Sequence, residues 1–149
     1  MRRLFRLLPL LLFLASLLLI LLESPILLQP LLNNPEIPVG TLISWLCIIM
    51  LPLSIIMNIR RIRKPTSKVY RFYKRVFLCF LLLGASWGFI SYYLAGNWSF
   101  TFSDTGVFRG SEEAFQLIVT YTFLLISLTL LFLIIFGIHH FIISKKHNK

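Results

Sequence analysis

Charged side chains are scarce in this sequence, and their scarcity excludes a soluble globular protein. Only 13% of the 149 residues are Asp, Glu, Lys or Arg, whereas soluble domains carry about 25%. So few charges do not cover the surface of a water-soluble domain, and the charges present are gathered in a few places. Between them lie long uncharged stretches at residues 7–22, 37–59, 76–108 (interrupted by Asp104) and 114–144.

Each uncharged stretch contains or approaches the roughly 20 apolar residues that a helix needs to cross a bilayer. We therefore predict an all-α integral membrane protein that forms one membrane domain over residues 1–149. Its four transmembrane helices are predicted at about residues 5–23, 39–58, 75–95 and 114–138. The first is similar to a secretory signal, but no small-residue cleavage site follows it, so we expect the helix to be retained.

Acidic residues are fewer than basic ones, 5 against 15, and the two kinds are separated along the chain. All basic residues except Arg109 fall at the N-terminus, between the second and third predicted helices, or at the C-terminus. Four spans place these three segments on one side of the membrane and all the acids, with Arg109, on the other. Because basic residues resist translocation, we predict cytoplasmic termini, a cytoplasmic basic loop at about 59–74, and outer loops at about 24–38 and 96–113.

The basic stretch reads NIRRIRKPTSKVYRFYKRV over residues 58–76 and contains no acid. In a soluble protein it would suggest nucleic acid, but here it serves membrane topology, so we predict no nucleic-acid partner. Its second half would form a helix with one apolar face made of Val69, Phe72, Tyr73 and Val76. The opposite side carries the bases that we expect to lie against anionic inner-leaflet lipids: Lys68, Arg71, Lys74 and Arg75. We expect the stretch to act mainly as a topology anchor, and specific binding of a lipid or a partner is the alternative.

Small residues recur at helical spacing in the third predicted helix. Gly84, Gly88 and Ser91 would allow another helix, in the same chain or in a second copy, to approach closely. Thr66 or Ser67 is a candidate N-cap before this region, and Ser111 is one before the fourth helix.

The two predicted outer loops are unusually apolar. The first contains four prolines, which prevent one continuous helix, and we predict a short piece resting on the membrane surface. The second is rich in aromatic residues, which suit either a small hairpin or an aromatic belt at the interface. We predict that it contacts another membrane protein through Trp98, Phe100, Phe102, Phe108 and Arg109.

Motifs that would indicate catalysis or transport are missing. The predicted spans contain no Asp, Glu, Lys or Arg, although coupled transport usually needs one. Cys47 and Cys79 are predicted at depths about 10–15 Å apart, too far for a disulfide. The sequence has no C-x-x-C, no phosphate-binding glycine loop, no H-E-x-x-H and no Ser/His/Asp set. We therefore predict no enzymatic activity, no catalytic residue, no metal site and no cofactor.

These features favour a small multi-pass protein of a bacterial inner membrane that acts by binding or modulating a membrane partner. In size, number of spans and lack of motifs, the chain resembles immunity proteins against pore-forming colicins and plasmid-encoded exclusion proteins. This likeness is one of format, since no motif is shared. The alternative is an oligomeric facilitator or an accessory subunit of a transport complex; an enzyme with an unusual site is the third class.

Overall fold

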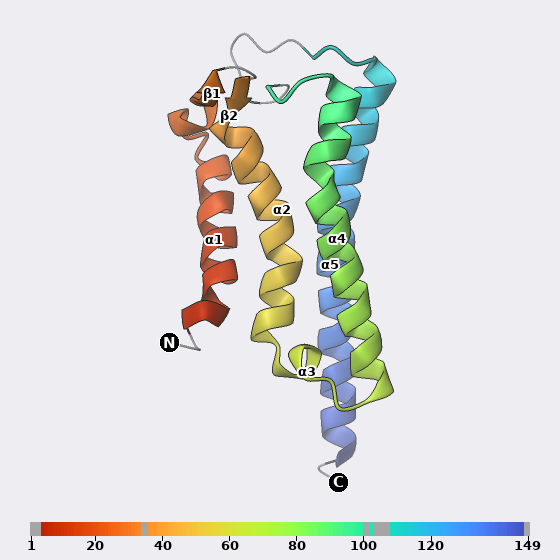
Figure 1. Cartoon of the computed structure of the whole chain (residues 1–149). Helices are drawn as coiled ribbons and strands as arrows, with labels where there is room; N and C mark the ends of the chain where they lie inside the picture. Colours follow the sequence, from red (N-terminus) through yellow and green to blue (C-terminus); the bar gives the residue numbers. More distant parts are fainter. Residues whose placement is uncertain (1–3, 34–35, 100–101, 103–107, 148–149) are drawn as a thin grey trace.

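The computed structural model describes residues 4–33, 36–99, 102 and 108–147, and it is mostly helical (Figure 1). Three helices are long and apolar enough to cross a membrane: α2 (Val39–Asn58), α4 (Lys68–Ala95) and α5 (Glu112–His147). The first helix, α1 (Leu4–Leu21), is also apolar but shorter. The structure therefore supports a helical membrane protein with three candidate spans, where we predicted four.

The segment predicted as the first outer loop folds into more structure than the sequence suggested. A 3-10 helix, η1 (Pro25–Leu28), is followed by β1 (Pro30–Asn33) and β2 (Glu36–Pro38), which pair antiparallel. Pro30 is paired with Pro38 at the end of this short ladder, where a missing N–H is best tolerated. We did not predict the two strands, because they are only four and three residues long and the prolines at their ends are unfavourable in most strands.

The basic loop predicted at 59–74 is largely helical. It contains α3 (Arg60–Arg63) and the first turns of α4, which begins at Lys68 instead of residue 75. Ser67 caps this start, accepting a hydrogen bond from the Tyr70 amide, and Ser111 accepts one from the Ala114 amide at the start of α5. Both caps were predicted from the sequence, and the structure confirms them. Helix α5 likewise continues beyond the predicted end at residue 138. The prediction stopped too early because hydropathy marks only the apolar part of a helix and not its polar extension.

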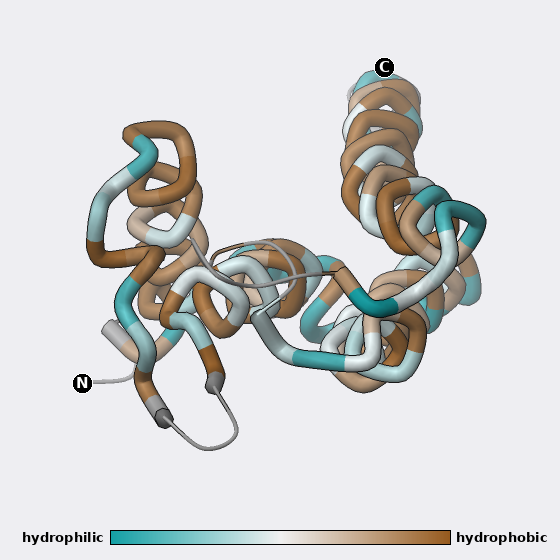
Figure 2. The backbone as a smooth tube through the Cα atoms, turned by 90° about the horizontal axis from the view of Figure 1, so that it is seen from above, coloured by the Kyte–Doolittle hydropathy of each residue, from teal (hydrophilic) through white to brown (hydrophobic). Residues whose placement is uncertain are grey.

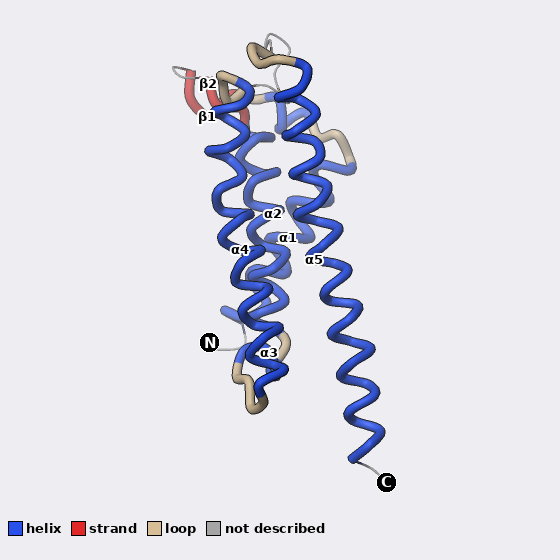
Figure 3. The backbone as a smooth tube through the Cα atoms, turned by 90° about the vertical axis from the view of Figure 1, so that its right-hand side faces the viewer, coloured by secondary structure: helices blue, strands red, loops and turns tan. Residues whose placement is uncertain are grey.

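The long helices form an open row instead of a closed bundle. Helix α1 packs along α2, α2 packs along α4 and also contacts α5, and α4 packs along α5, but α1 and α5 make at most a marginal contact. Figure 2 shows this row from above, and Figure 3 shows β1 and β2 at one end of the molecule and α3 at the other. We call these the hairpin end and the basic end.

Two groups of buried side chains fill the row. The basic-end cluster joins α2, α3, α4 and α5, and consists of Leu51, Ile55, Ile56, Ile62, Tyr70, Tyr73, Phe77, Phe80 and Phe136. The hairpin-end cluster is smaller and consists of Ile48, Trp87, Ala95, Ile118 and Leu125.

Candidate functional site

The contact between α2 and α4 depends on the small residues of α4. A Cβ at Gly84 would lie 3.2 Å from Ile48 Cγ2, and one at Gly88 would lie 2.6 Å from the Trp45 ring. The Trp45 indole crosses this face and donates from Nε1 to the carbonyls of Gly84 and Ala85, each at 3.1 Å. Ser91 is fully buried farther along α4. The structure thus places Gly84 and Gly88 against α2 of the same chain.

Pro52 of α2 lies close to the contact between α2 and Gly84 of α4 and affects the backbone hydrogen bonding there. It has no N–H, so the carbonyl of Ile48, four residues earlier, loses its helical partner. A Cβ at Gly84 would lie 3.5 Å from that same carbonyl oxygen. At Gly84, helix α4 therefore comes close to the backbone of α2 at a point where the helical hydrogen bonding of α2 is interrupted.

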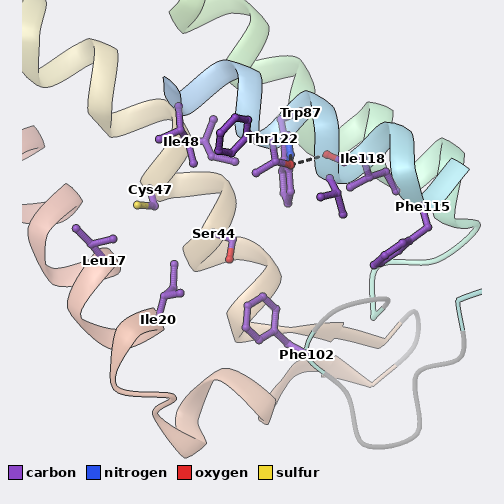
Figure 4. Close-up of a pocket in the computed structure, with 13 residues that line it drawn as sticks. Leu17, Ile20, Ser44, Cys47, Ile48, Trp87, Phe102, Phe115, Ile118 and Thr122 are labelled. Atoms are coloured by element: carbon purple, nitrogen blue, oxygen red, sulfur yellow. Dashed lines mark hydrogen bonds between the residues drawn. The ribbon is translucent and has the colours of Figure 1, made fainter. Parts of the chain in front are cut away.

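An apolar groove of about 500 Å³ lies between α1 and α5, with α2 as its floor (Figure 4). Its lining comes from all four long helices and one loop residue: Leu17, Ile20, Ser44, Cys47, Ile48, Trp87, Phe102, Phe115, Ile118, Val119, Thr122, Phe123 and Ile126. The groove exists because α1 and α5 are held apart by α2 and α4. We did not foresee it, since the sequence does not reveal which helices fail to meet.

The groove offers very few polar groups. The Thr122 hydroxyl accepts a hydrogen bond from Trp87 Nε1 at 2.7 Å and donates to the Ile118 carbonyl at 2.7 Å, so it is occupied within the protein. Ser44 and Cys47 are the other heteroatom side chains in the lining. A surface of this kind suits a guest that needs no hydrogen bonds.

The groove also has a defined length. Along α5 its lining extends from Phe115 to Ile126, a rise of about 16 Å at 1.5 Å per residue. This is roughly half of a 30 Å hydrocarbon core. The groove begins near the start of α5, so it occupies the half of the molecule at the hairpin end.

Three of the aromatic residues predicted to contact a partner are packed within the protein. Trp98 stacks on Tyr92 and Trp45, with ring centroids 4.7 and 6.1 Å apart. Phe108 meets Phe115 edge-on at 5.5 Å. Phe102 lies over Gly40 and lines the groove.

The other two predicted contact residues differ from these. Phe100 lies outside the described residues, as does most of the predicted hairpin after it. Arg109 is exposed, and no acidic side chain pairs with it within the part of the chain that is described.

The predicted basic residues lie on the first turns of α4. Lys68, Arg71 and Arg75 are exposed and Lys74 is half-buried. The apolar face predicted opposite them is only partly used, because Tyr73 is buried whereas Val69 and Phe72 are exposed. The buried face follows Tyr70, Tyr73 and Phe77 instead, because α4 already packs against α3 and α5 in these turns.

A polar network at the basic end joins α3, α4 and α5. Arg61 Nη1 donates to the Tyr70 hydroxyl at 2.8 Å, and Tyr70 also lies 3.4 Å from His140 Nδ1. The Tyr73 hydroxyl lies 3.4 Å from His139 Nδ1. We did not predict these contacts, although paired tyrosines and paired histidines on two neighbouring antiparallel helices are the pattern that would suggest them.

Among the residues that the structure describes, no three His, Cys, Asp or Glu side chains lie together as a metal site would need. Cys47 and Cys79 are both free thiols, which confirms that they do not pair. No protein family, curated protein or solved structure matches the chain.

Proposed function

We propose that this chain is a four-span protein of a bacterial inner membrane, with both termini in the cytoplasm, and that it acts non-catalytically by binding a membrane partner. The proposed orientation is supported by how the basic segments lie together. Asn58 donates to the carbonyl of Arg6 at 3.0 Å, so the basic N-terminal segment adjoins the basic stretch after α2. The C-terminal end of α5 lies at the same end of the molecule (Figure 1).

The proposed fourth span is α1. Its 18 residues extend about 27 Å, close to the 30 Å of a hydrocarbon core. It lies beside α2 over its length and exposes a strip of leucines, including Leu11, Leu14 and Leu18, on its outer face. Such a helix suits a lipid-facing position.

The groove between α1 and α5 is the observation that carries the binding proposal. Its guest is a hydrocarbon chain of the partner, either a lipid or an acylated molecule. Two properties select a hydrocarbon chain over a transmembrane helix of another protein. The groove spans only about half of the core, and an acyl chain of one leaflet has that length. The volume of about 500 Å³ lies within the 300–1,000 Å³ typical of ligand sites.

A quenching experiment tests this proposal, because Trp87 lines the groove. A fatty acid brominated along its chain is titrated into the purified protein in mild detergent. We expect saturable loss of tryptophan fluorescence in the wild type and a much smaller loss in Trp87→Phe. Val119→Phe, which fills the groove, should weaken binding about tenfold, as expected for a change of about 1.4 kcal/mol.

Leu117→Phe is the matched control. Leu117 is 58% exposed on the same helix and is not part of the groove. The same substitution there should leave the titration unchanged. Equal titrations for the two phenylalanine variants would mean that the quencher meets the protein through the detergent and not through the groove.

Contact with another membrane protein is a second candidate, favoured by Arg109. This base is exposed beside the start of α5, and an acidic group of a partner would pair with it. A photo-cross-linker at Glu112 in cells should give an adduct with a partner protein that Arg109→Glu abolishes and Arg60→Glu, at the opposite end, does not. An adduct unaffected by Arg109→Glu would remove this candidate. Replacing all of residues 98–109 would be a poorer test of partner contact, because Trp98 and Phe108 also pack against other aromatic rings of the protein.

A further inference from the structure

The first turns of α4 carry a hollow of about 310 Å³ on their exposed face. It is lined by Lys68, Arg71, Phe72 and Arg75. These positions are separated by three, four and seven residues, so they share one side of the helix. That side is opposite to the buried Tyr70, Tyr73 and Phe77. Lys74 falls outside the hollow, so three of the four bases predicted at the membrane surface gather around one space.

The positive charge in this hollow is uncompensated within the described chain. No acidic residue occurs in the first turn of α4, and the acids of the sequence are all far along the chain from residues 58–76. Like charges one turn apart repel each other. The helix dipole adds a partial positive charge at the same end. This arrangement is unfavourable in the protein alone, and a bound anion would relieve it.

The length of α4 places the hollow at the height of lipid headgroups. Its 28 residues extend about 42 Å, roughly 12 Å more than a hydrocarbon core, and this excess corresponds to about eight residues. The C-terminal part of α4 lies beside the apolar groove, so the excess is at the basic end, over residues 68–75. Phe72, which is 56% exposed, therefore sits among three bases at the boundary between headgroups and acyl chains.

We propose that this hollow binds the headgroup of an anionic phospholipid of the inner leaflet, and that a headgroup with two phosphates, as in cardiolipin, binds best. The three bases provide charge for two phosphate groups, and arginine can engage phosphate oxygens with two parallel hydrogen bonds. Phe72 contacts the first methylenes of the acyl chains. A soluble anion would gain nothing from Phe72, which is why the source is a lipid. This proposal is independent of the guest in the groove.

Native mass spectrometry of the full chain in mild detergent tests the site, with cardiolipin, phosphatidylglycerol and phosphatidylethanolamine as probes. We expect one retained cardiolipin, weaker retention of phosphatidylglycerol and none of phosphatidylethanolamine. Arg71→Gln with Arg75→Gln should lower cardiolipin retention at least tenfold, since each base near a lipid surface contributes several-fold. Lys68→Gln, at the first residue of α4, should lower it several-fold by itself.

The control removes the same charge from outside the hollow. Arg60→Gln with Lys64→Gln changes two exposed bases, one at the start of α3 and one just after its end, and should reduce retention less than about twofold. Equal losses in the two double variants would overturn the site in favour of diffuse surface charge. Displacement of cardiolipin by inorganic pyrophosphate would overturn the lipid assignment in favour of a soluble anion. Unchanged thermal unfolding of each variant shows that the fold is intact.

Discussion

At the basic end of the molecule, side chains from four helices fill the space between α2, α4 and α5, whereas at the hairpin end an apolar groove lies between α1 and α5. Different connecting segments reach these two places. Helix α3 returns the chain toward the bundle and buries Ile62 completely. At the hairpin end Phe102 is the loop residue that reaches the groove lining, among the described residues.

Inside a bilayer, helices gain little from hiding apolar surface from lipid, so their association depends on close contacts and hydrogen bonds. The basic end has both, in its aromatic cluster and its tyrosine–histidine network. Nearer the hairpin end, the helices are joined by the bonds from Trp45 to α4 and from Trp87 to Thr122. A groove open to lipid costs little stability, because hydrocarbon fills it.

The largest expected effect is the loss of a fully buried ring at the basic end. Phe77 is 0% exposed in the basic-end cluster, so Phe77→Ala leaves a cavity and should destabilise the protein by about 3 kcal/mol. Leu82→Ala is the control, because Leu82 is 70% exposed on the same helix. Unfolding in mixed micelles with increasing denaturing detergent measures both. Similar stability of the two variants would mean that the basic end is not the better-packed one.

The next effect tests the tight contact between Gly88 of α4 and Trp45 of α2, which lies toward the hairpin end. Gly88→Leu forces a side chain into the Trp45 ring and should cost about 2 kcal/mol. Gly137→Leu is the same substitution on α5, where a Cβ would meet nothing within 4 Å, and it should be tolerated. The unfolding assay compares them. Tolerance of leucine at Gly88 would show that α2 and α4 are not held together by this face.

Local features of the fold could be predicted from the sequence, whereas relations between distant segments could not. The helix caps at Ser67 and Ser111 could be predicted from residue type and position. The helix contact at Gly84 and Gly88 could be predicted from the helical spacing of these small residues. The groove depends on α1 and α5 standing apart, and no local pattern specifies that distance.

The extent of α4 was mispredicted for a related reason. Hydropathy identifies the part of a helix that lies in lipid, but Tyr70 and Tyr73 continue the same buried face into a basic region. Their partners lie about seventy residues later in the chain, at His140 and His139. A prediction made from each short stretch of sequence separately assigns the first turns of α4 to a loop or a surface helix.

The smallest expected effects come from single hydroxyl groups at the two ends. Tyr70→Phe removes the acceptor of Arg61 and the contact with His140, and should cost about 1 kcal/mol, because the bond to a charged donor is partly exposed. Tyr121→Phe removes a 2.8 Å bond to the Leu83 carbonyl between α5 and α4. Hydrogen bonds between helices in a membrane contribute about 0.6 kcal/mol on average, so this variant should be milder. Both are measured by the same unfolding assay. If Tyr121→Phe proved the more damaging, the hairpin end would depend on polar contacts between helices more than the basic end does, and the assignment of structural strength to the basic end would have to be reversed.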